Sequence, residues 1–391
     1  MKHLKFVVFI FIIFTCNGCY NYRELNQLAI TSAIGIDKNE DGFKVVIQIM
    51  NTQKQSTDAN ASYTQPNFVT YESEGKTLQE AMRSVILESP RRLFVNHLRL
   101  LVISENVAKD GMHDILDFFA RNTEFRKQFL VVISRNSETE DILNILTPLE
   151  TLNAKNISDS IETDYKYLGM SNMLKYEEML SIYLNPKTEL ALSTIQLQGS
   201  EKKGENKENI ESSSPSAFLK LQPLAIFKGD KMIGYLTSDE SIALGYIKYG
   251  IKNTIVDYEC DNGKNSSIEI LGVKNKITSK DNNIKIQITG SGNIKEMNCN
   301  VDLTKSKEID KIQEKVENNV KNSIEESIDN IILEYNSDVF GFKELIYKTS
   351  PKNYNKLEKK YGDDLLKNLD IEVSVDINLI AKGNIVEVIK E

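Results

Sequence analysis

The apolar positions near the start of the folded region follow the two-residue period of a β-hairpin. Residues 43–50 alternate so that Phe43 and later apolar side chains lie on one face of a strand. Residues 28–36 form an earlier apolar run, and the turn-forming residues 37–42 separate the two runs. This pattern predicts an antiparallel pair of strands, followed by a polar loop over residues 51–67.

A second group of apolar runs predicts a parallel unit. Residues 98–104 and 129–134 are apolar on both faces apart from Arg99, which is typical of buried strands. Residues 111–121 between them have a helical pattern. A strand, a helix and a strand joined by short links predict a right-handed βαβ unit.

Helical spacing also occurs on both sides of this unit. Residues 141–184 are mostly helical in pattern, and residues 188–198 predict a further strand. Residues 77–88 predict a preceding helix, and its apolar side comprises Leu78, Ala81, Met82, Val85 and Ile86.

The composition changes abruptly at residue 199. Residues 199–216 contain almost no apolar side chain and cannot build a core, so they predict a flexible linker or loop. Apolar runs resume at residues 217–227 and 232–236, on either side of a turn.

The last third of the chain predicts a sheet covered by one long helix. Residues 306–335 carry apolar side chains at spacings of three and four, opposite a charged face. Gly290-Ser291-Gly292 predicts a hairpin turn. Strands are expected near residues 253–260, 266–278, 283–291 and 294–303, with a closing strand at 371–380.

These elements predict an α+β protein with mixed sheets and packed helices, ending in a C-terminal antiparallel sheet with one long amphipathic helix. A chain of 391 residues is long enough for several domains. The predicted division is a lipoprotein signal peptide at 1–18, an N-terminal α/β region at 19–198, a flexible linker or loop at 199–216, a small middle region at 217–250 and a C-terminal α+β domain at 251–391.

Residues 1–18 have the composition of a signal peptide. Two lysines precede residues 6–14, an apolar run of nine residues that is too short to span a bilayer as a helix. A glycine directly before Cys19 resembles the lipobox of bacterial lipoproteins, in which the cysteine receives a diacylglyceryl group and becomes the first residue. Cys19 is the predicted lipidation site. A signal peptide cut elsewhere, an uncleaved anchor and lipidation at Cys16 are the alternatives.

The net charge argues against a nucleic-acid binder. The formal charge is −8, and removal of the two lysines of the signal peptide makes it −10. Nucleic-acid binding requires a basic face that neutralises phosphates. An acidic protein is also not expected to be attracted to anionic lipid by its net charge.

Residue types that support catalysis are scarce. The three histidines are His3, His97 and His113, and His3 lies in the signal peptide. We expect His97 to pack or form a hydrogen bond at a strand entrance. Two histidines without neighbouring cysteines do not suit zinc, and the chain has no nucleophile elbow or phosphate-binding loop. We therefore expect no catalytic residue, metal or cofactor, and a protein that is not an enzyme.

The mature chain has two cysteines beyond the lipidation site, Cys260 and Cys299. Both fall in or near expected strands of the C-terminal domain, and an exported domain permits a disulfide between them. The alternative is a pair of buried free thiols. We favour the free thiols, because sequence spacing does not establish the geometry that a disulfide requires.

Arginines precede both strands of the βαβ unit. Arg91 and Arg92 lie before the first strand, and Arg121 and Arg126 lie before the second. Parallel strands begin at the same edge of a sheet, so we expect both groups to converge there. One interpretation is a local ion-pair network with Glu88 and Glu124. The other is a basic contact surface that faces a partner protein, a role that suits the guanidinium group.

Five groups of residues resemble the Ger(x)C family of spore germination proteins, the lipoprotein subunits of nutrient germinant receptors. In chain order they are Gly18-Cys19-Tyr20 with Arg23-Glu24-Leu25-Asn26 and Ala33-Ile34-Gly35-Ile36-Asp37; Ser89-Pro90-Arg91-Arg92-Leu93-Phe94 with His97-Leu98-Arg99; Leu116-Asp117-Phe118-Phe119-Ala120-Arg121-Asn122 with Glu124-Phe125-Arg126; Phe227-Lys228-Gly229-Asp230-Lys231 with Gly234-Tyr235-Leu236; and Ser337-Asp338-Val339-Phe340-Gly341-Phe342 with Gly383. The chain departs from the family pattern at Tyr20 and Tyr354, where tryptophan is usual.

The resemblance implies a three-domain lipoprotein on the outer surface of the inner spore membrane. It also implies assembly with a multi-spanning subunit and a transporter-like subunit of the receptor, and it carries over no catalytic residues. We therefore expect a lipid-anchored subunit that supports receptor assembly and the germination response. The alternative is a lipid-anchored protein that captures a small germinant itself, which predicts an enclosed apolar pocket with converging polar groups. A cell-wall hydrolase would instead need paired acids or a metal in a cleft.

Overall fold

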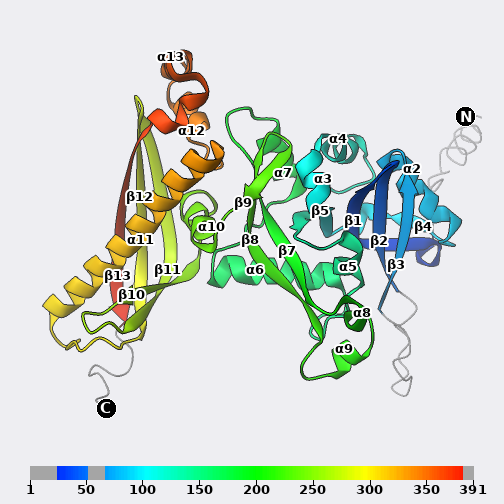
Figure 1. Ribbon diagram of the computed structural model, residues 1–391, viewed down its shortest axis with the longest axis horizontal. Coiled ribbons are helices and arrows are strands. Elements are labelled where there is room, and N and C mark those ends of the chain that lie inside the picture. The colour runs from blue at the N-terminus through cyan, green and yellow to red at the C-terminus, as the bar shows by residue number, and fades with distance from the viewer. Residues whose placement is uncertain (1–23, 52–66, 382–391) are drawn as a thin grey trace, which may run out of the picture.

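The structure is a computed structural model that describes residues 24–51 and 67–381, and its described part contains two sheets (Figure 1). The larger sheet has nine strands in the order β3-β2-β1-β5-β6-β7-β8-β9, with β4 paired to β1. Its strands are β1 Leu28–Asn39, β2 Gly42–Met50, β3 Phe68–Gly75, β4 Arg92–Phe94, β5 Leu100–Ser104, β6 Leu130–Ser134, β7 Ala191–Gly199, β8 Ala217–Lys228 and β9 Lys231–Tyr235.

Helices cover both faces of the nine-stranded sheet. Because both faces are covered, β5 and β6 are buried at every position. One hydrophobic core includes residues of α2 Leu78–Ser84, α3 Glu105–Asp110, α4 His113–Arg121 and α7 Tyr176–Tyr183. The core on the other face includes residues of α5 Thr139–Asn144 and α6 Asn153–Tyr167.

The predicted hairpin and the βαβ unit are both confirmed. Strands β1 and β2 pair antiparallel, and Ile34 lies opposite Ile47. Strands β5 and β6 pair in parallel from Leu100 and Leu130 onward, with α3 and α4 between them. The polar loop expected at 51–67 lies almost wholly outside the described residues.

The helix expected at residues 77–88 is shorter than predicted. Helix α2 ends at Ser84, and a 3-10 turn at Val85–Leu87 replaces its last turn. The change of helical pitch keeps Val85 buried but leaves Ile86 58% exposed. The assignment of Ile86 to the buried side was therefore wrong.

Residues 199–216 are a loop inside the sheet and not a link between domains. They connect β7 to the adjacent antiparallel strand β8 and include the short helices α8 Glu201–Gly204 and α9 Glu208–Glu211. The side chain of Asn209 is buried, donates to the carbonyls of Leu146 and Ala217 at 2.9 Å each, and accepts from the Ala217 amide. Polar bonds therefore hold a segment that has almost no apolar side chain.

The middle region predicted at residues 217–250 has no sheet of its own among the described residues. Strands β8 and β9 belong to the nine-stranded sheet. The following helix α10 Ser238–Leu244 and a π-helical turn at Gly245–Tyr249 contribute side chains to the hydrophobic core of the second sheet. The same core includes Leu224 and Ile226 of β8, so part of the nine-stranded sheet packs into the core of the second sheet.

The second sheet has the strand order β10-β11-β12-β13. Its strands are β10 Asn253–Glu259, β11 Asn265–Lys280, β12 Asn283–Glu296 and β13 Asp370–Ala381. The hairpin turn expected at Gly290-Ser291-Gly292 was wrong, because these residues lie within β12. A Cβ atom on Gly292 would stand 2.5 Å from Leu379 and 3.1 Å from Ile268. The glycine therefore lets three strands pack closely and does not form a turn.

The expectation of a wholly antiparallel C-terminal sheet was also wrong, because β13 pairs in parallel with β12. A parallel pair requires a crossover connection. Here the crossover contains the helices α11 Ser306–Tyr335, α12 Phe342–Thr349 and α13 Pro351–Tyr361. The mixed α+β class that the sequence predicts is retained.

Helix α11 has the bounds that the apolar period predicts and lies along the second sheet (Figure 1). Its buried stripe runs from Ile312 to Ile332 and faces the core shared with β11, β12 and β13. The helix also bonds the sheet directly, since the Glu317 carboxylate accepts from the backbone amide of Ile377 at 2.9 Å. This bond satisfies a donor on the edge strand.

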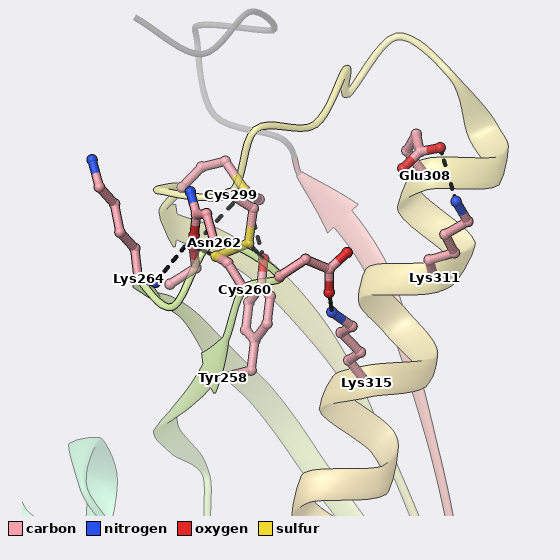
Figure 2. A network of polar contacts seen from close by, with 11 residues as sticks. Tyr258, Cys260, Asn262, Lys264, Cys299, Glu308, Lys311 and Lys315 are labelled. Atoms are coloured by element: carbon pink, nitrogen blue, oxygen red, sulfur yellow. Dashed lines mark hydrogen bonds and ion pairs between the residues drawn. A yellow bond between two sulfur atoms is a disulfide. The ribbon is translucent and has the colours of Figure 1, made fainter. Parts of the chain in front are cut away.

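A disulfide joins Cys260 to Cys299, so our preference for free thiols was wrong (Figure 2). The bond links the turn between β10 and β11 to the segment that follows β12. Antiparallel pairing of β11 with both neighbours brings these two segments to the same end of the sheet, with Ser267 opposite Glu296. An ion pair of 2.5 Å between Lys315 and Asp261 connects α11 to the same turn.

Candidate interaction surface

The arginines are concentrated in one part of the chain. The sequence has 48 basic residues, of which eight are arginine, and every arginine lies at or before residue 135. Arg83 lies near the end of α2, Arg91 and Arg92 at the start of β4, Arg121 at the end of α4 and Arg126 before β6. Arg83, Arg92 and Arg121 line one common groove, and we call the surface around them, with Arg91 and Arg126 close by in the chain, the arginine face.

The arginine face forms because several parallel strands begin there. Leu28 of β1 pairs with Arg92 of β4, and β5 and β6 enter the sheet in the same direction. The predicted convergence of the two arginine groups is confirmed by an ion pair, in which Arg92 donates to Glu124 at 2.6 Å. Helices α2 and α4 and strand β4 lie toward the same end of the molecule (Figure 1).

Part of the predicted ion-pair network is present. Besides the pair of Arg92 with Glu124, Arg121 donates to Asp117 at 2.8 Å, and this hydrogen bond lowers the pKa of the Asp117 carboxyl. Glu88 forms no ion pair within the described part of the chain. Over the same residues, Arg83 and Arg126 also form none. Two guanidinium groups of the face therefore have no carboxylate partner among residues 24–51 and 67–381.

An aromatic cluster holds the end of α4 and the loop that follows it. The ring centroids of Phe119 and Phe125 are 4.7 Å apart, and those of Phe119 and Phe129 are 5.3 Å apart. Lys127 donates to the carbonyls of Phe119 and Asn122, and burial lowers the pKa of its ammonium group. The segment that resembles the family between residues 116 and 126 thus fixes the backbone that presents Arg121 and Arg126.

Three contiguous grooves cross the arginine face. Their volumes are about 400, 480 and 690 Å³. Arg92 and Glu124 line both the first and the third groove, and Phe118 and Arg121 line both the second and the third. The charged pairs therefore form ridges between shallow depressions.

An exposed apolar tip borders the third groove, and sequence reasoning missed it. Ile86 is 58% exposed and Leu87 is 88% exposed. Both belong to the 3-10 turn after α2. The missed signal was the proline at position 90, because a proline shortly after an apolar helix pattern favours an early helix end.

The remaining segments that resemble the family support the fold. Gly35 lies where a Cβ atom would stand 2.3 Å from the Thr139 hydroxyl, and that hydroxyl donates to the carboxylate of Asp37. Burial raises the pKa of Asp37. The Asp230 carboxylate, in the turn between β8 and β9, accepts from the His113 amide at 3.2 Å and so caps α4.

A second polar site lies at the junction of the two sheets. Asp338 is buried, and its carboxylate accepts from the amides of Gly341, Phe342 and Lys343 at 2.7 to 2.9 Å. Lys248 donates to the Val339 carbonyl at 2.6 Å. Burial lowers the pKa of Lys248 to about 8 and raises that of Asp338. No pattern in the sequence indicated that Lys248 would be enclosed.

The segment around Asp338 also bonds the first sheet. The Ser337 hydroxyl donates to the Phe227 carbonyl at 2.7 Å, and the Glu189 amide donates to the Asp338 carbonyl at 3.0 Å. The fourth and fifth segments that resemble the family therefore meet at this junction. They hold the two sheets together.

Tyr354, which replaces the tryptophan usual in the family, is well packed. It is 4% exposed, contacts Tyr347 edge to face at 5.5 Å and donates to Glu358 at 2.6 Å. His97 is exposed and lies 5.5 Å from the ring of Phe94, which agrees with the packing role expected for it.

Direct capture of a germinant would need a binding pocket, and a groove between α10, β10 and α11 is the candidate for one. Its volume is about 550 Å³, and its lining includes the acidic residues Asp239, Glu240, Asp257 and Glu326 but no basic residue. It is a polar surface groove, unlike the enclosed apolar pocket that the capture hypothesis predicts.

Cys19, the predicted lipidation site, lies outside the described residues, and so does Tyr20. The described chain begins at Glu24, close to the arginine face through β1. Within residues 24–51 and 67–381, no helix combines the length and the apolar character needed to cross a bilayer.

Comparison with known proteins gives consistent matches along the chain. Residues 21–197 match the family described as "Spore germination protein N-terminal domain", and residues 222–383 match "Spore germination B3/ GerAC like, C-terminal". Spore germination protein KC of Bacillus subtilis (strain 168) is 26% identical over 98% of this chain and 96% of its own length. Spore germination protein B3 of the same organism is 22% identical over 97% of this chain and 98% of its own.

A solved structure shares the fold. The crystal structure of the GerBC protein aligns with a TM-score of 0.55 at 17% sequence identity, covering 89% of this chain and 96% of the other. The first family match ends within β7 and the second begins within β8, so the two matches lie on either side of the β7–β8 loop, where the composition of the sequence changes. The chain belongs to the Ger(x)C family of spore germination proteins, the C-subunit family of germinant receptors.

Proposed function

We propose that this protein is a lipid-anchored subunit of a spore germinant receptor, held at the outer surface of the inner spore membrane through a diacylglyceryl group on Cys19. Its role is to support assembly of the receptor with the multi-spanning and transporter-like subunits, and thereby the germination response. The observation that carries the proposal is the family membership together with the Gly18-Cys19 pair, which lies five residues before the described chain begins.

The structure supports a scaffolding role. The polar groups at the sheet junction are bonded to one another and to backbone, so they are occupied in holding the fold. The exposed features lie elsewhere, at the arginine face and along the outer side of α11. A lipidated cysteine would tether the chain beside the arginine face, because β1 starts there.

Anchoring is tested with Cys19→Ala, and Cys16→Ala is the matched control. The Cys19 variant should incorporate no labelled palmitate and should leave the membrane fraction, while the Cys16 variant should behave as wild type. Spores with the Cys19 variant should respond poorly to nutrients. If the Cys19 variant stays in the membrane fraction, residues 6–14 are an uncleaved anchor and the proposal fails.

Assembly is tested by affinity capture of the multi-spanning subunit from detergent-solubilised spore membranes. The wild-type chain should co-purify with it and with the transporter-like subunit. If the receptor subunits assemble in full amounts without this chain, the assembly role is excluded and direct germinant capture becomes the stronger hypothesis.

A further inference from the structure

We propose that the arginine face and the exposed tip formed by Ile86 and Leu87 dock onto the phospholipid headgroups of the bilayer that holds the anchor. This inference rests on the proposed anchoring at Cys19. The arginines would meet phosphate oxygens at the membrane surface, and the apolar tip would meet the acyl chains just beneath.

The first argument is the length of chain between the anchor and the fold. Nine residues separate Cys19 from Leu28, and even a fully extended chain of that length spans only about 30 Å. Leu28 pairs with Arg92 at the start of β4. The arginine face is therefore the part of the described fold that the anchor holds nearest to the bilayer. The second sheet lies at the other end of the long axis (Figure 1).

The second argument is the kind and placement of charge. Arginine binds phosphate oxygens through a planar fork of donors, which lysine lacks. Five of the eight arginines lie on this face, while the chain after residue 135 has lysine as its only strongly basic residue. Arg83 and Arg126 form no ion pair with any other described residue.

The same face also carries acidic groups. Asp117 and Glu124 pair with Arg121 and Arg92, and Asp114 lines the second groove beside Lys76. Each arginine in these pairs has five N–H donors and uses at most two of them on its carboxylate partner. The net charge of the chain, which argued against lipid binding, is a sum over the whole surface. It does not describe a face on which arginines are gathered.

The third argument is the apolar tip. Leu87 is 88% exposed, and Ile86 beside it is 58% exposed. Arg83 precedes these residues, and Glu88 directly follows them before Arg91 and Arg92, so three basic groups and one acidic group flank the apolar pair. Apolar side chains among basic ones are the arrangement with which interfacial segments enter the boundary between headgroups and acyl chains. Contact with a bilayer does not require a protein surface of complementary shape, so the shallow grooves of this face are compatible with it.

The test uses the absence of tryptophan from the chain, which makes any introduced tryptophan a unique fluorophore. The full chain carrying Leu87→Trp is expressed, lipidated, purified and reconstituted into vesicles of phosphatidylcholine with about one third phosphatidylglycerol, an anionic lipid. Leu149→Trp is the matched control. Leu149 is 92% exposed and lies between α5 and α6, and the nearby Leu146 amide donates to the Gly204 carbonyl in the β7–β8 loop.

The Leu87→Trp protein should show a blue-shifted emission and should lose most of it when the lipids are brominated. The Leu149→Trp protein should show neither effect. Arg83→Glu combined with Arg126→Glu should return the emission of the Leu87→Trp protein to that of a water-exposed indole, while the protein still floats with the vesicles.

Flotation separates failure of the proposed function from failure of this inference. If the acylated protein does not float with vesicles, the anchoring proposal fails. If it floats but the indole at position 87 stays in water, headgroup docking is refuted. If that indole becomes buried only when the multi-spanning and transporter-like subunits are added, the face binds protein, as the contact-surface interpretation of the sequence predicts, and the lipid proposal is overturned.

Discussion

Replacing Ile324 with alanine tests whether α11 holds the second sheet by packing. Ile324 lies in the middle of the apolar stripe and is 1% exposed. Val320, one turn earlier, is also buried but lines the acidic groove, so a change there would also alter a surface that water reaches. Ile324→Ala removes three carbons from a fully enclosed site and adds no polar atom.

The expected loss follows from transfer and cavity terms. Removal of three buried carbons costs roughly 2.4 kcal/mol at about 0.8 kcal/mol each. An incompletely filled cavity adds to this cost, and measured losses for such changes run from about 2 to 5 kcal/mol. Alanine regains a few tenths of a kcal/mol, roughly 0.4, through its higher helix propensity. We therefore expect a net loss of about 3 kcal/mol in the free energy of unfolding.

The matched control is Leu333→Ala on the same helix, where the leucine is 69% exposed. A surface change of this kind is expected to stay within about 0.5 kcal/mol. Urea unfolding followed by far-UV circular dichroism measures both variants. With a urea dependence of about 1 to 3 kcal/mol per molar, the Ile324 midpoint should fall by about 1 to 3 M. Equal midpoints for the two variants would refute the packing of α11 on the sheet.

Two further predictions concern the buried cation and the disulfide. The pKa of Lys248 is lowered to about 8, so between that pH and 10.5 the unfolded chain binds a proton that the folded chain does not. The free energy of unfolding, relative to that of Lys248→Met, should therefore rise across this window by up to about 3 kcal/mol. An unchanged difference between pH 7.5 and 10 would show that the ammonium group is hydrated. Replacing Cys260 and Cys299 with serine should cost about 4 kcal/mol, because the bond closes a loop with a sequence separation of 39. A reductant should lower the melting temperature of the wild type and leave that of the double variant unchanged.

Local patterns predicted the elements whose burial follows a single period. The bounds of α11 match the expectation because an apolar side chain recurs every three or four residues along most of the helix. The hairpin of β1 and β2 was predicted from a two-residue period, and β5 and β6 from short runs that are apolar on both faces. Of the candidate site, the sequence placed the two arginine groups at one sheet edge, since parallel strands share a starting edge.

Errors arose where a neighbour distant in sequence decides the conformation. Gly290-Ser291-Gly292 has the composition of a turn, but the closeness of Leu379 makes small residues necessary within a straight strand. Ile86 fits a helical stripe, but α2 ends before it and leaves it exposed. Asn209 lies in a polar segment that reads as a loop, and its burial depends on carbonyls at Leu146 and Ala217.

By itself, the sequence predicted a processing segment with its candidate lipidation site, both outside the described residues, and it determined the order of most strands and helices and the family, because each depends on residues that are near one another in the chain. Only the tertiary structure decided the parallel entry of β13, the bond between Cys260 and Cys299, and the enclosure of Lys248 beside Asp338. It also decided that Arg83 and Ile86 line one groove with Arg92. These features depend on contacts between segments far apart in sequence, and local patterning does not specify which segments meet.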